Sequence, residues 1–139
     1  YLGQKHKLAG KTEKESLLID ILTHEANDLV INVLKCMKCP KVIQESVKAE
    51  FLAKFEPKLQ EFEDFMKEKQ FTLGEDLSYA DFLLYTGLDY LRYYDAQVLE
   101  KYDELKNYCD RMEALPELDK YFKSDKFVRA PGPMFVKST

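Results

Sequence analysis

Hydrophobic side chains recur every three or four positions along most of this chain, and no stretch alternates with period two for long enough to predict a strand. Five segments carry the helical period. We expect helices at about 13–38, 42–69, 79–94, 102–115 and 117–124. Two long helices followed by shorter ones predict an all-α fold, a helical bundle of about five helices.

Two prolines mark expected changes in these helices. Pro57 lies inside the second segment, and we expect it to bend or divide that helix because it removes one intrahelical hydrogen bond. Pro116 is expected to end the fourth helix or open the fifth. Residues 129–136 contain two more prolines and a glycine, so they should lie extended over the surface.

The third helical segment has the most specific beginning. Gly74 interrupts the chain, and Ser78 stands three residues before Asp81, which is the pattern of an N-terminal capping box. In that box the Ser78 hydroxyl accepts from the amide of residue 81, and the Asp81 carboxylate reaches back to the amide of residue 78. The following helix, 79–94, is apolar on nearly every face and too short to span a membrane. It is therefore predicted to be a buried central helix.

Composition narrows the classes of function. Of the 139 residues, 45% are hydrophobic and 13% aromatic, which excludes a disordered chain and predicts one domain with a real core. Charged residues make up 33% with both signs interspersed and a net charge of −4, whereas a nucleic-acid site needs a clustered basic face. No apolar run approaches the roughly 18 residues of a membrane span. We expect neither nucleic acid nor a membrane as partner.

The first residues predict a boundary. Tyr1 and Leu2, followed by basic residues at 5–7, have the pattern of the last turn of a helix that Gly10 ends. Thr12 and Glu15 then form a second capping-box pattern. We expect residues 1–10 to be the end of a preceding domain with its linker, and residues 11–139 to be the helical domain.

The three cysteines are Cys36, Cys39 and Cys109, too few and too scattered for a secreted disulfide framework. The C-x-x-C formed by the first two suggests redox or zinc chemistry, but it lies at the end of a helical pattern, and no second ligand pair follows. His6 and His24 do not supply metal-ligand spacing. We expect reduced, partly packed thiols and no metal.

A polar stripe runs along the first long helix. Asp20, His24 and Asp28 are spaced four residues apart and share one face. This pattern suits a solvated face, a face toward a ligand or interface, or, less well, a metal site.

The string F-x-x-G-x-x-x-S-x-x-D-F, from Phe71 to Phe82, resembles the motif that opens the core helix in the helical domain of cytosolic glutathione transferases. Residues 1–10 resemble the end of the preceding domain and the short interdomain linker of the mu class, and residues 115–127 resemble its penultimate helix. The resemblance covers essentially the whole chain. It implies a cytoplasmic, homodimeric enzyme that adds glutathione, a co-substrate, to small apolar electrophiles with no cofactor. A thioredoxin-like first domain would carry the activating tyrosine, so this chain alone is not expected to be active.

The resemblance also implies roles at the dimer cleft. Asp28 matches an aspartate that reaches across the dimer to the α-amino group of glutathione bound by the partner. Ile21, Phe62 and Phe65 match an apolar socket that receives an aromatic side chain from the partner's first domain. Core packing is the alternative explanation for these three residues.

Further positions match the electrophile site. Val30, Ile31 and Leu34 match residues that face the electrophile, although core packing explains them too. Lys38 stands where the mu pattern usually has a tyrosine, and a cation there would favour acidic electrophiles. Phe135 matches a tail aromatic that covers the pocket.

A second class of function stays open. Glutathione-transferase-like helical domains also serve as non-catalytic interaction or scaffold modules, and Lys38 in place of tyrosine fits a pocket that no longer selects substrates. A preceding thioredoxin-like domain with an early tyrosine and a proline-containing glutathione loop would favour the enzyme.

Overall fold

The structure is a computed structural model, and it describes residues 1–128. Its helices follow in the order α1 (Leu2–Lys5), α2 (Glu13–Lys38), η1 (Lys41–Ile43), α3 (Gln44–Met66), α4 (Tyr79–Tyr94), η2 (Ala96–Leu99), α5 (Asp103–Glu113) and α6 (Pro116–Phe122). The expected extended tail and Phe135 lie outside the described residues.

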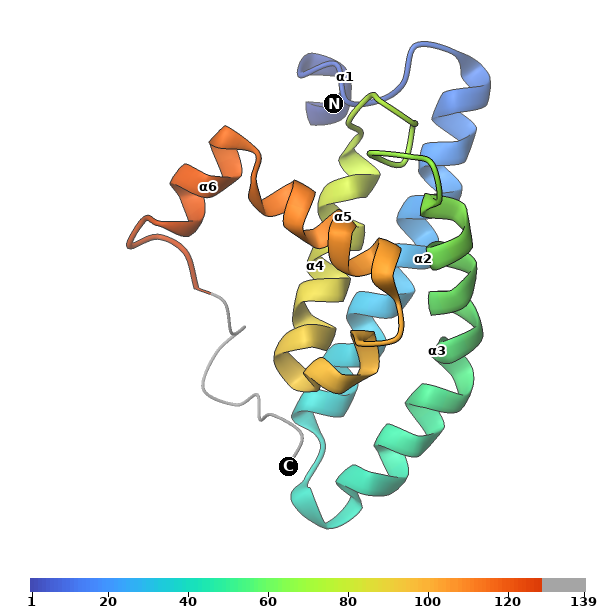
Figure 1. Cartoon of the computed structure of the whole chain (residues 1–139), viewed down its shortest axis with the longest axis vertical. Coiled ribbons are helices and arrows are strands. Elements are labelled where there is room, and N and C mark those ends of the chain that lie inside the picture. The colour runs from blue at the N-terminus through green and yellow to red at the C-terminus, as the bar shows by residue number, and fades with distance from the viewer. Residues whose placement is uncertain (129–139) are drawn as a thin grey trace.

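All five predicted helices are present, and the all-α prediction is confirmed. In Figure 1, α2 and α3 form a long hairpin joined by η1 at one end of the molecule, α4 packs along α2, and α5 crosses α4. Residues 1–128 form no β-strand, only isolated bridges between Phe71 and Gly74 and between Leu73 and Asp76. No helix in this part of the chain combines the length and apolarity that a membrane span requires.

Of the two outcomes expected at Pro57, a bend or a division of the second helix, the division does not occur. α3 continues through it from Gln44 to Met66, and its ribbon bends along the way (Figure 1). One missing donor is tolerated because the neighbouring residues Phe55 and Leu59 are anchored in the core, at 4% and 0% exposure. Pro116 occupies the first turn of α6, where its missing amide has no helical partner to lose.

The prediction of a buried central helix is confirmed, since no residue of α4 is exposed. Close packing against α2 depends on Gly87. A Cβ atom at that position would lie 3.0 Å from Leu29 Cδ2 and 3.3 Å from Val30 Cγ2. The missing side chain therefore lets the two helices approach closely.

Asp81 and Ser78 form a capping box at the start of α4. The Asp81 carboxylate accepts from the Ser78 amide at 2.8 Å, and the Ser78 hydroxyl accepts from the Ala80 amide at 3.2 Å. Thr72 and Tyr108 add donors that the sequence pattern did not predict. The start of α4 is thus tied both to the preceding loop and to α5.

Glu63 caps another helix from a distance. Its side chain projects from α3 and accepts from the amides of Glu104 and Leu105, both at 3.0 Å, in the first turn of α5. The carboxylate is largely buried, at 9% residue exposure, and it satisfies amides that otherwise have no helical partner.

Glu63→Ala should therefore lower the free energy of unfolding by about 2 kcal/mol, because two amides lose a charged acceptor. Urea unfolding measures the effect as a lower midpoint at unchanged slope. Asp64→Ala, at the next position and solvent-exposed, is the matched control and should leave the midpoint near that of the wild type. Equal midpoints for the two variants would contradict the role of Glu63.

Candidate functional site

The polar stripe of α2 is organised by hydrogen bonds to the helix itself and to α4. The Tyr79 hydroxyl donates to the Asp20 carboxylate at 2.8 Å, and this bond raises the pKa of Tyr79. His24 Nδ1 lies 2.7 Å from the Asp20 carbonyl, which accepts. Asn32 donates to the Asp28 carbonyl at 2.8 Å.

Asp28 differs from the rest of the stripe. Its side chain is exposed, and its carboxylate forms no hydrogen bond or ion pair with any residue in the described part of the chain. Its oxygens are therefore accessible to a cation from outside the domain.

The described residues contain no metal cluster, and two of their three cysteines are buried. Within residues 1–128 no three His, Cys, Asp or Glu side chains are arranged to hold a metal ion. The three cysteines are free, and burial raises the pKa of Cys36 to about 11 and that of Cys109 to about 12. The half-buried Cys39 thiol donates to the Cys36 carbonyl at 3.1 Å. The buried thiols of Cys36 and Cys109 are therefore poor nucleophiles at neutral pH.

The residues matched to the electrophile site differ in exposure. Val30 and Leu34 are half-buried, with Val30 close to Gly87 of α4 and Leu34 packed against the core. Ile31 is 42% exposed, and Lys38 is exposed in the last turn of α2. They lie along α2, outside the lining of the hollow described below.

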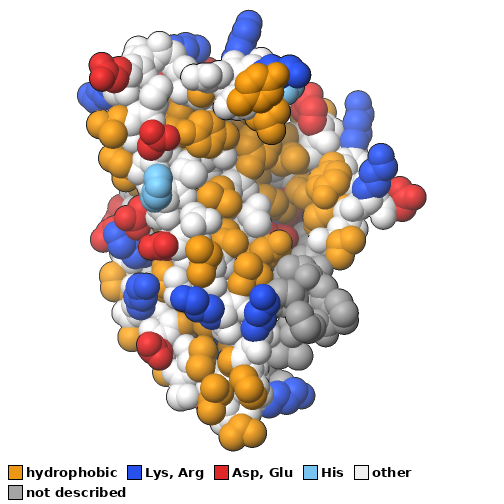
Figure 2. All heavy atoms as spheres, turned by 180° about the vertical axis from the view of Figure 1, so that it is seen from behind, with side chains coloured by type: hydrophobic (Ala, Val, Ile, Leu, Met, Phe, Trp, Pro, Cys, Tyr) orange, Lys and Arg blue, Asp and Glu red, His pale blue; other side chains and the backbone are white. Residues whose placement is uncertain are grey.

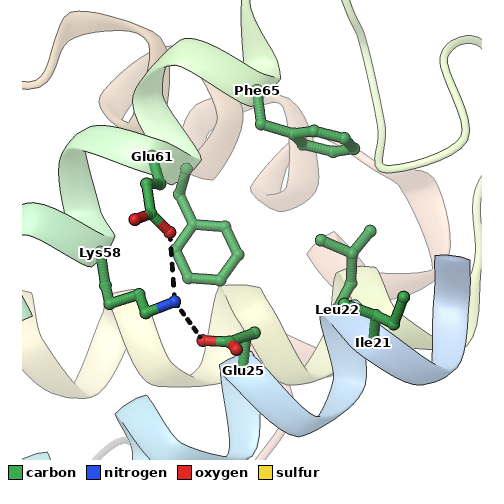
Figure 3. Close-up of a pocket in the computed structure, with 7 residues that line it drawn as sticks. Ile21, Leu22, Glu25, Lys58, Glu61 and Phe65 are labelled. Atoms are coloured by element: carbon green, nitrogen blue, oxygen red, sulfur yellow. Dashed lines mark hydrogen bonds and ion pairs between the residues drawn. The ribbon is translucent and has the colours of Figure 1, made fainter.

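A hollow of about 270 Å³ lies between α2 and α3 (Figure 3). Its lining includes all three residues predicted to form the socket, Ile21, Phe62 and Phe65, together with Leu22. Ile21 is 52% exposed although apolar, whereas Phe62 is buried at 6% exposure. The hollow therefore presents an apolar wall that residues 1–128 leave unfilled.

One side of this hollow is charged. Lys58 Nζ lies 3.2 Å from a carboxylate oxygen of Glu25 on α2 and 3.2 Å from one of Glu61 on α3, as the dashed lines in Figure 3 show. This triad was not predicted from the sequence. The spacing of Lys58 and Glu61 on one helix would have suggested a pair, but the contact to Glu25 requires the packing of α2 against α3.

Asp28 lies near this hollow. It follows Glu25 by three positions on α2, which is close to one helical turn, and both residues are at the surface of the helix. A partner seated in the hollow would therefore come close to the accessible carboxylate.

The family model for the glutathione S-transferase C-terminal domain matches residues 28–125. The chain belongs to this family. The predicted resemblance to the helical domain of mu-class glutathione transferases is thereby confirmed, since the related sequences include mu-class enzymes over nearly the whole chain.

Among the relatives of this glutathione transferase domain, glutathione S-transferase Mu 1 of Bos taurus is 33% identical over 99% of the chain. Glutathione S-transferase B of Cavia porcellus is 35% identical over the same share. The alignments cover 61% of each relative, so the chain spans about three fifths of their length.

Solved structures agree on the fold. The Onchocerca volvulus Pi-class glutathione S-transferase superposes with a TM-score of 0.72 at 29% identity, covering 86% of this chain and 59% of that one. The glutathione S-transferase Blo t 8 gives a TM-score of 0.78 at 24% identity, covering 89% and 59%.

Proposed function

We propose that this chain is the C-terminal helical domain of a cytoplasmic, homodimeric glutathione transferase that conjugates glutathione to small apolar electrophiles. Glutathione serves as co-substrate, and no other cofactor takes part. Residues 1–10 end the preceding domain and its linker, and residues 11–139 form the helical domain. The observation that carries the proposal is the accessible carboxylate of Asp28 beside the unfilled apolar hollow.

Chemistry would be divided between the two domains. The preceding domain lowers the pKa of the glutathione thiol from its ordinary value of about 8.5, which raises the thiolate fraction at neutral pH. Asp28 pairs with the ammonium group of glutathione held by the partner subunit and thereby orients it. Without the preceding domain this chain has no group to activate the thiol, so it would be inactive alone.

The far end of α2 would shape the electrophile site. Val30, Ile31 and Leu34 would contribute apolar surface, and the resemblance assigns a covering role to Phe135, which is outside the described residues. Lys38 stands in place of the usual tyrosine. Its ammonium group would extend the range of substrates toward electrophiles that carry a negative charge.

The hollow between α2 and α3 supports the homodimer. Its apolar wall, including the exposed Ile21, would receive an aromatic side chain from the partner's first domain. A symmetric dimer would fill both copies of the hollow at once.

Asp28→Asn tests the glutathione contact in the intact protein. The affinity for glutathione should fall by roughly two- to thirtyfold, because a partly exposed charge pair contributes about 0.5 to 2 kcal/mol. Glutathione lacking its α-amino group should bind the native protein about as poorly, and the variant should barely distinguish the two ligands. Titration calorimetry on the four combinations measures the coupling.

Glu13→Gln removes another exposed carboxylate at the distant start of α2 and should leave both affinities unchanged. Additive losses for Asp28→Asn and the truncated ligand, with no coupling between them, would contradict the assignment.

Lys38 also supports the alternative, a non-catalytic interaction or scaffold module in a larger assembly. An exposed cation where the family usually has a tyrosine hydroxyl fits a protein that has lost selection for conjugation. An intact protein that binds glutathione but fails to conjugate it to any small apolar or acidic electrophile would favour the module.

A further inference from the structure

The turn that joins α2 to α3 exposes apolar side chains at the end of the bundle. Val42 is 96% exposed and Ile43 48% exposed, both in η1. Figure 1 places this turn at the far end of the hairpin, and Figure 2 shows hydrophobic side chains gathered at the same end, with Lys and Arg side chains near them. We name Lys35, Lys38, Lys41, Val42 and Ile43 the α2–α3 tip.

Positive charge is concentrated at this tip. Residues 35–43 contain three lysines and no acidic residue, in a chain whose net charge is −4. Lys35 and Lys41 are exposed and form no ion pair with any residue from 1 to 128. By contrast, Lys48 in the following helix is neutralised by Asp95 at 2.5 Å. The tip therefore combines exposed apolar groups with a local excess of cations.

We propose that the α2–α3 tip binds the surface of an anionic lipid membrane. Val42 and Ile43 enter the boundary between headgroups and acyl chains, and Lys35 and Lys41 lie against the lipid phosphates and carboxylates. This contact goes beyond the proposed conjugation of glutathione and does not depend on it.

The apolar residues select a membrane over other anionic partners. Nucleic acid or an acidic peptide would attract Lys35 and Lys41 but would leave an almost fully exposed Val42 in water. The expectation of no membrane partner rested on the length of apolar runs in the sequence, which concerns spanning helices and not surface contact.

The contact is weak for one tip and stronger for two. A lysine close to an anionic surface contributes about 1 kcal/mol, or about fivefold in affinity. In a dimer with both tips facing the same membrane, the second contact becomes intramolecular. The overall affinity for the membrane is then higher than that of either tip alone. We therefore expect reversible binding that depends on salt and on lipid charge.

Co-sedimentation of the intact protein with sucrose-loaded vesicles tests the proposal. Phosphatidylcholine vesicles containing phosphatidylserine should retain the protein at low salt, and pure phosphatidylcholine vesicles should not. Lys35→Gln combined with Lys41→Gln should reduce the partition coefficient about 25-fold per tip, from about fivefold for each lysine. Val42→Ser combined with Ile43→Ser should also reduce it severalfold.

The matched control is Lys14→Gln combined with Lys120→Gln, two exposed lysines outside the tip that change the net charge equally. This control should bind as the native protein does. Equal loss in the control and tip variants, equal binding to the two kinds of vesicle, or binding that is insensitive to Val42 and Ile43 would each overturn the proposal. Circular dichroism of every variant separates lost binding from lost folding.

Discussion

Replacing Asp81 by alanine should lower the free energy of unfolding by about 3 to 5 kcal/mol, because several buried donors lose their acceptor at once and each one left unsatisfied costs about 1 to 3 kcal/mol. Asp81 is fully buried at the start of α4. Its carboxylate accepts from the Thr72 amide and hydroxyl, both at 2.8 Å, and from the Ser78 amide at 2.8 Å. The Ser78 and Tyr108 hydroxyls donate to it at 3.1 Å.

The effect is large because these donors have no access to water. Removing the carboxylate leaves buried amides and hydroxyls of the Thr72 loop, the cap and α5 unsatisfied together. Burial and the neighbouring Asp81 hold the pKa of Tyr108 well above its ordinary value, so that hydroxyl stays protonated and remains a donor at neutral pH.

Urea unfolding of the intact protein measures the change, with the slope showing whether the denatured state is affected. Ser78→Ala is the matched variant: it removes a single capping hydroxyl and should lower stability by about 1 kcal/mol. If Asp81→Ala is no more destabilising than Ser78→Ala, Asp81 acts only as a local cap and does not hold the loop and α5 to α4.

Phe65→Asp should convert the proposed dimer of the intact protein to monomers. Phe65 is half-buried and lines the hollow with Ile21 and Phe62. An aspartate there would have to lose its hydration when the partner's aromatic side chain enters, or else the contact would not form. A loss of about 3 kcal/mol raises the dissociation constant more than 100-fold.

Light scattering over a concentration series measures the change in mass, and circular dichroism confirms that the helices persist. Phe65→Leu keeps the wall apolar and should remain dimeric. Val42→Asp, an equally charged substitution at the α2–α3 tip, should also leave the dimer intact. A native protein that is already monomeric would contradict the dimer itself, whereas a dimeric Phe65→Asp variant would exclude the hollow as its interface.

The helices could be predicted from sequence because their signals are local. The period of apolar residues depends on neighbours three and four positions apart, and the capping pattern of Ser78 and Asp81 spans only four residues. The resemblance rested on the same ordered string of local motifs from Phe71 to Phe82. These features predicted the bundle, its buried helix and its family.

The sites depended on how the helices pack. Periodicity placed Ile21 and Phe62 on apolar faces alike, but only the pairing of α2 with α3 exposed the first and buried the second beside one hollow. Likewise, α3 continues through Pro57 because the residues around it are packed in the core, which local patterns do not predict.

Contacts between polar residues that are far apart in the sequence could not be predicted from local patterns either. Glu63 caps α5 about forty residues further along the chain, Lys58 reaches Glu25, and Tyr108 completes the shell of Asp81. The positions of the helices and the start of α4 follow from preferences that act between close neighbours in the sequence. Which charged side chains meet and which apolar residues stay exposed became clear only from the folded structure, because both depend on the angle and register at which the helices pack.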